Sequence, residues 1–351
     1  MSFRDELLRL FPALRRLAPG AYVVGGAIRD LLRGQPPADV DVACADPLAC
    51  AQSLGSKVIR LGKDHLSAYR VVAGPHVYDF AEILDGDIVR DLARRDFTVN
   101  AMAVDLASGD LLDLHGGRDD LTRCLVRMVD PRNFDDDPLR LLKGVRMAVI
   151  FGFDIDAATV EAIRQRAPRI GSIAAERVTY ELSIIFSAGA FRRALDLLRA
   201  TGLNAPLLDR QAGAIRFHAD DVPLPAALAL LLAEPRAYAK RWKWSANLLR
   251  EVLTIQQLLD ATGDLRVALY DAGEATARDF LAAVRAVGRD DRIDLPDFSL
   301  RALLTGDEIA SQKALPPGPE LGRLKRALLE AQIRGEVRDR EEAEKFVRLS
   351  S

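Results

Sequence analysis

Residues 21–30 read AYVVGGAIRD, and residues 39–42 read DVDV. The apolar run that opens the first segment predicts a short strand, and the glycine pair after it predicts a tight turn into a helix. The second segment predicts another strand, because apolar and polar residues alternate along it. A strand, a glycine turn, a helix and a second strand in this order indicate a mixed α/β unit at the start of the chain.

The hydrophobic pattern of the remaining sequence changes along the chain, from strand-like runs to helical periodicity. Further strands are expected at 58–61, 68–73 and 76–83, and one helix is expected at 47–54. From about Asp136 onward, apolar residues recur every three or four positions, which predicts helices. These apolar helical faces are Leu139, Leu142, Val145 and Val149, then Val178, Leu182 and Ile185, then Leu195 and Leu198. Breaks are expected near Gly202, Pro223, Gly263, Pro296 and 316–319. The expected fold class is therefore α+β, with a small mixed sheet followed by an all-α region.

Composition limits the kinds of partner. The chain has 351 residues and a formal net charge of −2, with 49 lysines and arginines. This balance argues against nucleic-acid binding through overall charge, so any RNA site must be a local basic patch. The sequence has neither a run of about 18 apolar residues nor a secretory signal at its start. Cys44, Cys50 and Cys124 follow no metal or disulfide pattern, so a cytoplasmic location is expected.

Asp39 and Asp41 are the most informative pair of side chains. In a strand they project to one side, while Val40 and Val42 project to the other. Two carboxylates on one side of a strand can converge on a hard cation, and Mg²⁺ prefers oxygen ligands. A solvated strand edge is the alternative interpretation, because a lone D-x-D segment is common.

The glycine turn upstream favours a nucleotide site with a metal. Glycine lets a backbone approach phosphates closely, and the N-terminus of a helix favours anions. Arg29 adds a cation close to Gly26. Asp79 is the best candidate for a third carboxylate, followed by Glu82. The alternatives are a structural turn with surface charges, and polar residues on a half-exposed strand.

Several longer motifs follow one another between residues 21 and about 186. They are VVGGAIRD at 23–30, DVD at 39–41, RRDFTVNAMA at 94–103, DLHGGRDDL at 113–121, DDPLR at 136–140, and Glu176-Arg177 with Glu181. Together they resemble the class II tRNA CCA-adding enzymes and bacterial poly(A) polymerases of the DNA polymerase β nucleotidyltransferase superfamily. The segments at 304–307 and 318–322 are similar to the tails of these enzymes, whereas the similarity across 203–299 is faint.

The resemblance implies four parts and one activity. The parts are a catalytic nucleotidyltransferase head at 1–128, a helical neck for base recognition at 129–205, a helical body at 206–295 and a helical, tRNA-binding tail at 296–351. The implied enzyme adds nucleotides from CTP or ATP to the 3′ end of tRNA without a nucleic-acid template. The reaction would be an in-line attack that depends on Mg²⁺.

The resemblance also implies roles for residues of the head. The metal ligands would be Asp39 and Asp41; Asp79, expected from the strand pattern alone, would be a third catalytic carboxylate. The residues around the nucleotide would be Gly25, Gly26 and Arg29 at the triphosphate, Arg95 beside the nucleotide, and Asp96 and Asn100 at the ribose hydroxyls. A surface ion-pair cluster is the alternative for residues 94–96.

Asp137 and Arg140 would act as a protein template in the neck. Their spacing of three places both on one face of a helix. A carboxylate accepts from the amine of cytosine or adenine, and a guanidinium donates to the adjacent ring nitrogen, whereas uracil and guanine present an acceptor to the carboxylate. An ordinary helix ion pair is the alternative. Arg146 is a further nucleotide contact, and Lys143 stands where the family commonly has arginine, so it keeps the charge without the two-point fork.

The interval between the last head strand and Arg94 is short, reading LDGDIVRDL at 84–92. Complete CCA-adding members carry a longer flexible loop here, which helps the site change from cytosine to adenine. Members that add only the two cytosines are shortened at this place, so the sequence favours a CC-adding enzyme. The alternatives are a complete CCA-adding or A-adding enzyme, a poly(A) polymerase, and a non-catalytic RNA-binding protein of the same fold.

Two basic segments are candidate contacts for the tRNA acceptor arm, which proteins grip by phosphates and shape. They supply Lys240, Arg241 and Lys243 in the segment 238–244, and Arg323, Lys325, Arg326 and Arg334 in the tail. For the first segment the alternative is a helix with tryptophan packed inward and cations outward.

Overall fold

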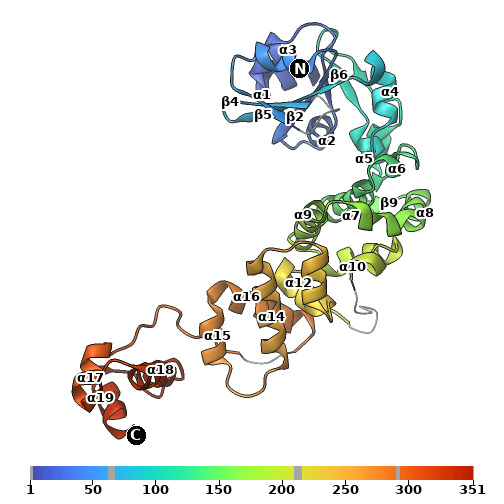
Figure 1. The fold of residues 1–351 in the computed structure, drawn as a ribbon. Coiled ribbons are helices and arrows are strands. Elements are labelled where there is room, and N and C mark those ends of the chain that lie inside the picture. Colours follow the sequence, from blue (N-terminus) through green and yellow to red (C-terminus); the bar gives the residue numbers. More distant parts are fainter. Residues whose placement is uncertain (1–2, 62–67, 209–215, 290–292, 351) are drawn as a thin grey trace. The chain divides into compact units, whose positions relative to one another are not determined.

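The computed structural model describes residues 3–61, 68–208, 216–289 and 293–350. Its internal contacts divide the chain into two compact units. The first consists of Met1–Glu181 with Asp196–Leu207, and the second of Leu182–Leu195 with Leu208–Ser351. Figure 1 shows the elements of both units coloured along the chain.

The first unit is built on a mixed sheet of seven strands. In spatial order they are β3 (Val58–Leu61), β4 (Ala68–Ala73), β5 (His76–Glu82), β2 (Asp39–Cys44), β1 (Tyr22–Val24), β6 (Ala103–Asp105) and β7 (Leu111–Leu112). β2 and β5 run parallel, and the other neighbours are antiparallel. The strands expected from the sequence are confirmed to within one residue. β6 and β7 were not expected, because strands this short carry too little alternation to detect.

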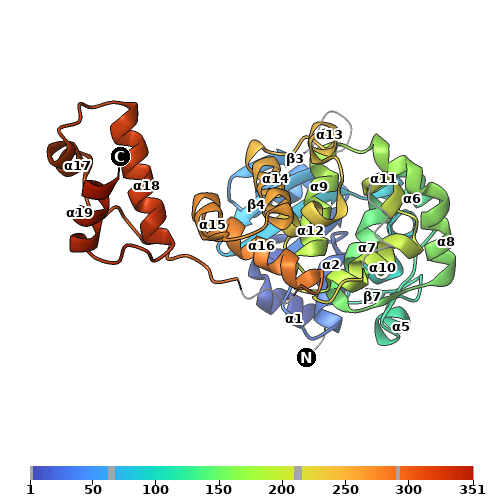
Figure 2. The same cartoon turned by 90° about the horizontal axis from the view of Figure 1, so that it is seen from below.

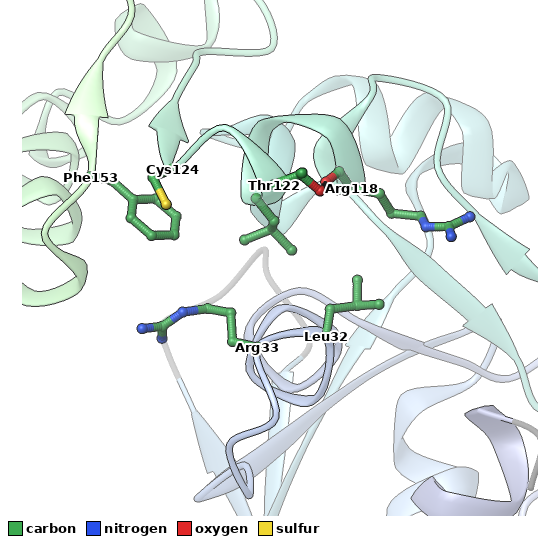
Figure 3. A pocket seen from close by; sticks show the side chains of 7 residues that line it. Leu32, Arg33, Arg118, Thr122, Cys124 and Phe153 are labelled. Atoms are coloured by element: carbon green, nitrogen blue, oxygen red, sulfur yellow. Dashed lines mark hydrogen bonds between the residues drawn. The ribbon is translucent and has the colours of Figure 1, made fainter.

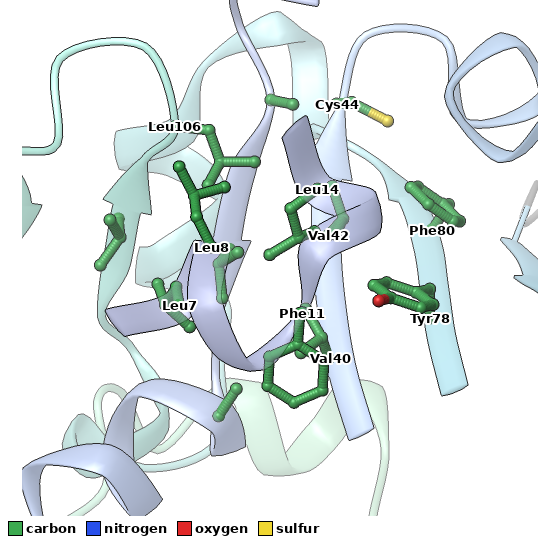
Figure 4. Packing of buried hydrophobic residues seen from close by; sticks show 14 of the residues in the cluster. Leu7, Leu8, Phe11, Leu14, Val40, Val42, Cys44, Tyr78, Phe80 and Leu106 are labelled. Carbon is green, nitrogen blue, oxygen red and sulfur yellow. The ribbon is translucent and has the colours of Figure 1, made fainter. Parts of the chain in front are cut away.

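Alternation along β2 and β5 gives the sheet one apolar face and one acidic face. Val40, Val42, Tyr78 and Phe80 are buried on the apolar face. Helix α1 (Phe3–Leu10) and the 3-10 helix η1 (Pro12–Arg16) pack against them, as Figure 4 shows, and α3 (Pro47–Ser53) joins the same core. Asp39, Asp41 and Asp79 alternate with these residues and therefore face the other side.

Short helices complete the head side of the first unit. They are α2 (Gly26–Leu32), η2 (Leu84–Gly86), α4 (Ile88–Ala93), η3 (Thr98–Asn100) and α5 (Gly117–Thr122). The helix expected after the glycine turn is confirmed as α2. The interval at 84–92, expected to be a shortened loop, is folded into η2 and α4.

Helices follow in the second half of this unit. They are α6 (Asn133–Asp136), α7 (Leu139–Phe151), α8 (Ala157–Arg166), η4 (Ala167–Ser172), α9 (Ala175–Phe186), α10 (Phe191–Ala200) and α11 (Asn204–Leu207), of which α9 and α10 contribute residues to both units. The predicted apolar faces in α7, α9 and α10 are buried. One small parallel pair, β8 (Leu125–Val126) with β9 (Asp154–Ile155), interrupts the helical region that the sequence predicts.

The second unit is helical in its described residues. It contains α12 (Leu224–Leu231), α13 (Pro235–Arg241), α14 (Ala246–Asp260), α15 (Arg266–Ala272), α16 (Glu274–Ala286), α17 (Gly306–Lys313), α18 (Pro319–Ile333) and α19 (Arg340–Leu349). α12, α14 and α16 lie side by side in both views (Figures 1 and 2). α17, α18 and α19 surround a small core of their own (Figure 2). The predicted breaks fall between helices.

The four-part division expected from the sequence stays a prediction, because two compact units do not test its boundaries. Across the part of the chain that the structure describes, every helix is too short or too polar to cross a membrane.

Candidate active site

Three aspartates lie on one face of adjacent strands. Asp41 on β2 is the register partner of Asp79 on the parallel strand β5. Asp39 is two residues before Asp41 and therefore projects to the same side. Neighbouring strands are about 4.8 Å apart, so the side chains of register partners approach closely. The predicted side-by-side placement of Asp39 and Asp41 is present, and both residues are exposed.

The Asp79 carboxylate is held by an arginine from the next strand. Arg70 on β4 is the register partner of Asp79. Its Nε donates to Oδ1 at 2.7 Å and its Nη2 to Oδ2 at 2.6 Å. These two hydrogen bonds raise the pKa of Arg70, and Asp39 and Asp41 contribute to the same direction. Nothing in the sequence pattern singled out Arg70, because only the strand register shows its partner.

Crowding affects the protonation of Asp41. Asp41 keeps exposed surface on this face, but neighbouring protein atoms partly desolvate its carboxylate, which raises its pKa to about 6. Asp39 and Asp79 raise the pKa further, whereas Arg95 and Lys143 oppose the shift. Among the described residues, no three histidine, cysteine, aspartate or glutamate side chains are grouped closely enough to hold a metal ion.

Gly25 brings the turn after β1 into contact with this acidic face. Its φ of 75° is in the left-handed region that favours glycine. A Cβ at this position would lie 3.1 Å from Arg95 Nη1 and 3.5 Å from Asp41 Oδ2. The turn, Asp41 and Arg95 therefore meet at one point, and the triphosphate site at this turn stays a prediction. Gly26 follows as the first residue of α2.

Asp91 is a buried carboxylate that the sequence reading missed. It is 3% exposed and lies on α4. Its Oδ2 accepts from Arg95 Nη2 at 3.0 Å, and its Oδ1 accepts from Arg94 Nη2 at 3.2 Å. Asp91 therefore fixes both arginines of the R-R-D segment. Its position three and four residues before them on a helix was the available signal.

Arg29 is linked to the other predicted nucleotide residues. Its Nη1 donates to Asn100 Oδ1 at 2.7 Å, and Asn100 Nδ2 donates to Asp96 Oδ1 at 3.1 Å. Arg29 also makes two hydrogen bonds to Asp30 and lies 4.7 Å from the centre of the Phe151 ring. The structure thus joins Arg29, Asn100 and Asp96 in one network. The predicted role of Arg29 at the triphosphate stays a prediction.

A cavity of about 330 Å³ holds the predicted base-recognition residues. Its lining consists of Asp91, Arg94, Arg95, Asp96, Asp137, Arg140 and Lys143. Arg140 Nη1 donates to the backbone carbonyl of Arg94 at 2.7 Å. Asp137 Oδ2 accepts from Arg177 Nη2 on α9 at 3.2 Å. The two template candidates are therefore held in place by partners from other segments.

Arg146 does not line this cavity. Its Nε lies 3.2 Å from Glu181 Oε2, and Glu181 is 3% exposed. Burial raises the pKa of Glu181, and Arg146 opposes that shift. This pair fastens α7 to α9 within one turn of the Arg177 contact. The predicted contact between Arg146 and a nucleotide stays a prediction.

The predicted RNA contacts of the second unit lie on α13 and α18 or directly after them. Lys240, Arg241 and Lys243 are exposed, whereas Trp242 is 4% exposed. This is the inward tryptophan of the alternative interpretation. In the tail, exposed residues include Arg323, Lys325 and Arg326, and Arg334 is half-buried. Arg326 is bound to Asp271 and Glu330, which offset its charge. RNA contact by these residues stays a prediction.

A second cavity, of about 410 Å³, shares no residue with the predicted site. It is lined by Leu32, Arg33, Arg118, Leu121, Thr122, Cys124 and Phe153. Figure 3 shows Leu32 and Arg33 on α2 facing the side chains of Thr122, Cys124 and Phe153. The Arg33 guanidinium lies 4.1 Å from the centre of the Phe151 ring, so it is held by an aromatic side chain.

Comparison with known proteins matches this geometry. Residues 21–127 match the poly A polymerase head domain, and residues 152–213 match the probable RNA and SrmB-binding site of polymerase A. The chain is 30% identical to a CC-adding tRNA nucleotidyltransferase of Geobacter sulfurreducens, over 93% of this chain and 91% of the relative. It is 31% identical to an A-adding tRNA nucleotidyltransferase of Deinococcus radiodurans, over 97% and 98%.

Solved structures agree. The Bacillus stearothermophilus CCA-adding enzyme in complex with CTP aligns with a TM-score of 0.76 at 28% identity, over 99% of this chain and 98% of that chain. The head-domain match and the named relatives define the chain as a nucleotidyltransferase. The chain belongs to the tRNA nucleotidyltransferase family, which includes the CCA-adding, CC-adding and A-adding enzymes.

Proposed function

We propose that this chain transfers nucleotides from CTP, or from CTP and ATP, onto the 3′ end of tRNA without a nucleic-acid template. The supporting observation is the meeting of three features in the first unit. Asp41 and Arg95 adjoin the Gly25 turn, and Arg95 also lines the cavity that contains Asp137 and Arg140. A triphosphate beside the turn would place its base towards that cavity.

The acidic face suits Mg²⁺. Asp39 and Asp41 offer hard oxygen ligands, and the raised pKa of Asp41 reflects first the partial desolvation of its carboxylate and then repulsion from Asp39 and Asp79. Asp39 and Asp41 would hold the ion, with Asp79 as a third carboxylate. When bound, Mg²⁺ neutralises charge that develops on the α-phosphate as the RNA 3′-hydroxyl attacks and pyrophosphate leaves.

The chain's own residues bind and orient the nucleotide. The backbone of Gly25 and Gly26 can approach phosphates closely, because neither residue carries a Cβ. Arg95, held by Asp91, presents a fixed cation beside Asp41. Asp96 and Asn100, joined by a hydrogen bond, are positioned to accept from and donate to ribose hydroxyls. Holding both reactants in one geometry supplies much of the acceleration in such reactions.

Asp137 and Arg140 select the base. The Asp137 carboxylate accepts from the exocyclic amine that cytosine and adenine share, and Arg140 donates to the adjacent ring nitrogen. Lys143 lines the same cavity as a compact cation. It contributes a positive charge at the position where relatives commonly have an arginine, whose guanidinium can make two parallel hydrogen bonds.

We favour CC addition over complete CCA addition. The interval before Arg94 is occupied by η2 and α4, and this compact link supports an enzyme without the long flexible loop of the CCA-adding members. Relatives at similar identity include a CC-adding and an A-adding enzyme, so identity alone does not choose between them. The expected partner is the tRNA acceptor arm, as the complex of the Thermotoga maritima CCA-adding enzyme with tRNA suggests. The cytoplasmic location stays a prediction.

One assay tests both levels of this proposal. Transcripts ending at the discriminator base, at C or at CC are incubated with CTP or ATP separately, and product lengths are read. A CC-adding enzyme completes the first two transcripts with CTP and leaves the CC end unextended with ATP. Efficient extension of the CC end with ATP would show that the chain is a CCA-adding or A-adding enzyme rather than a CC-adding one. No extension of any transcript would refute the enzyme activity itself.

Substitution of the aspartates separates chemistry from binding. Asp39→Asn and Asp41→Asn should abolish extension while leaving tRNA affinity within about twofold, because neither residue lies on the predicted RNA surface. The matched control is Asp46→Asn, which removes a carboxylate that caps α3 in the same unit. It should retain activity.

A further inference from the structure

The acidic face of the sheet has a cation of its own. Arg70, Asp79 and Asp41 are successive register partners across β4, β5 and β2, so their side chains form one row on one face. Arg70 occupies both Asp79 oxygens through hydrogen bonds of 2.7 and 2.6 Å. Two of the roughly four lone-pair positions of this carboxylate are therefore already used, and the guanidinium charge repels a cation that approaches the others.

We propose that Arg70 competes with the divalent cation for Asp79 and so weakens the binding of free metal to the site. This inference rests on the proposed function, which assigns Asp39 and Asp41 as the metal ligands. With Arg70 in place, Asp39 and Asp41 are the carboxylates of the acidic face that Arg70 leaves open. A metal that arrives with a nucleotide brings phosphate oxygens as ligands and depends less on Asp79. Arg70 therefore favours the metal–nucleotide complex over the metal alone.

The ion pair can open without loss of the fold. The Arg70 side chain is 43% exposed and Asp79 is 20% exposed, so water reaches both groups. β4 is held by backbone pairing on both sides, to β3 and to β5, and does not depend on this pair. An exposed arginine of this kind can move aside when a competing charge enters the site.

The proposal is tested by titrating the full chain with Mn²⁺ in the absence of nucleotide. The electron paramagnetic resonance signal of the free ion measures how much Mn²⁺ is bound. Arg70→Gln should tighten Mn²⁺ binding about fivefold, the effect of removing one unit charge from a partly solvated site several ångströms away. Asp79→Asn alone should weaken binding, because it removes a negative charge and leaves the Arg70 charge uncompensated beside the site. The double variant Arg70→Gln/Asp79→Asn should lose most of the gain.

A matched control removes the same charge nearby. Arg60 lies on β3 and pairs in register with Tyr69, so it faces the opposite side of the sheet from Arg70. Arg60→Gln should leave Mn²⁺ affinity unchanged. A circular dichroism melt of each variant checks that the sheet is intact.

Two results would overturn the role of Arg70. One is unchanged or weaker Mn²⁺ binding in Arg70→Gln, and the other is a gain that persists in full in the double variant. Failure of the proposed metal site is recognised separately, because Asp39→Asn and Asp41→Asn would then leave Mn²⁺ binding intact in every background. With MnCTP in place of Mn²⁺, the effect of Arg70→Gln should be smaller; an equal effect would contradict the preference for the complex.

Discussion

The Asp91 carboxylate lies 3.0 Å from the Arg95 guanidinium and is almost fully buried. It also accepts from Arg94, so one buried charge positions two cations of the R-R-D segment. A buried charge that loses its partner is costly, and each side of this pair therefore needs the other. We expect Asp91 to act through Arg95 as a positioning residue for the nucleotide.

Asp91→Asn keeps the shape of the side chain and removes its charge. We expect the KM for CTP to rise about tenfold, equivalent to about 1.4 kcal/mol, because Arg95 loses the contact that holds it beside Asp41. Steady-state kinetics with a fixed tRNA transcript measure the change. Asp120→Asn is the matched control, since Asp120 is equally buried and pairs with Arg127. The control should lower the Tm and leave this KM unchanged; a tenfold rise in both would contradict the role of Asp91.

Gly25→Ala should reduce kcat/KM by more than about tenfold. A Cβ would enter the space 3.1 Å from Arg95 Nη1, and the positive φ adds backbone strain of about 1 kcal/mol. Gly20→Ala isolates the strain, because Gly20 has a φ of 88° and no atom within 4 Å of its added Cβ. Gly20→Ala should lose stability alone. Equal kinetic losses in the two variants would show that strain rather than contact is responsible.

The pKa of Asp41, about 6, predicts a pH dependence of metal binding. A protonated carboxylate does not bind a cation, so Mn²⁺ affinity without nucleotide should rise with pH and level off above about 6. Below that pH the apparent Kd should increase about tenfold for each unit of pH, because one proton is displaced. Calorimetry between pH 5 and 8 measures this. An affinity that is flat down to pH 5 would contradict the shifted pKa.

The raised pKa of Asp279 on α16 predicts that this group destabilises the folded protein as the pH rises, the opposite of what most carboxylates do. Burial raises its pKa to about 6, and Glu251 adds repulsion. A folded-state pKa above the unfolded value means that the folded protein binds the proton more tightly. This group therefore favours folding at low pH and loses that contribution as the pH rises from about 4 to about 6.

Asp279→Asn removes the cost of the buried charge. At pH 7.5 the Tm should rise by about 2–4 °C, equivalent to about 1 kcal/mol after allowing for partial exposure. At pH 4 the variant and the original chain should melt together. Glu251→Gln, which removes only the repulsion, should give a smaller gain. A lower Tm for Asp279→Asn at pH 7.5 would mean that the carboxylate makes a favourable contact.

Local patterns were enough to predict the strands that carry the site. The alternation of Asp39, Val40, Asp41 and Val42 predicted a strand with one acidic and one apolar face, and the structure has both. Helical periodicity likewise predicted the buried faces of α7 and α9. These features depend on residues close in sequence, where periods of 2 and 3.6 are visible.

Contacts between distant segments could not be predicted in the same way. Arg70 meets Asp79 only through the β4–β5 register, and Asp137 meets Arg177 across 40 residues. Asp91 appeared as part of a short interval rather than as a buried partner of Arg94 and Arg95. Each of these pairs is set by tertiary packing, which a single sequence does not display.

The tight β4–β5 hairpin, in which Ala73 pairs with His76, fixes which residues can reach Asp79. Adjacent residues on a strand face opposite sides, so a turn one residue longer or shorter would invert β4 as a whole. Arg70 would then point into the core. Val71, which is fully buried in this structure, would point out to the acidic face. Whether the number of residues in this turn is odd or even thus determines which side chain of β4 lies beside Asp79. Insertions and deletions in this hairpin should be tolerated only in steps that preserve that parity.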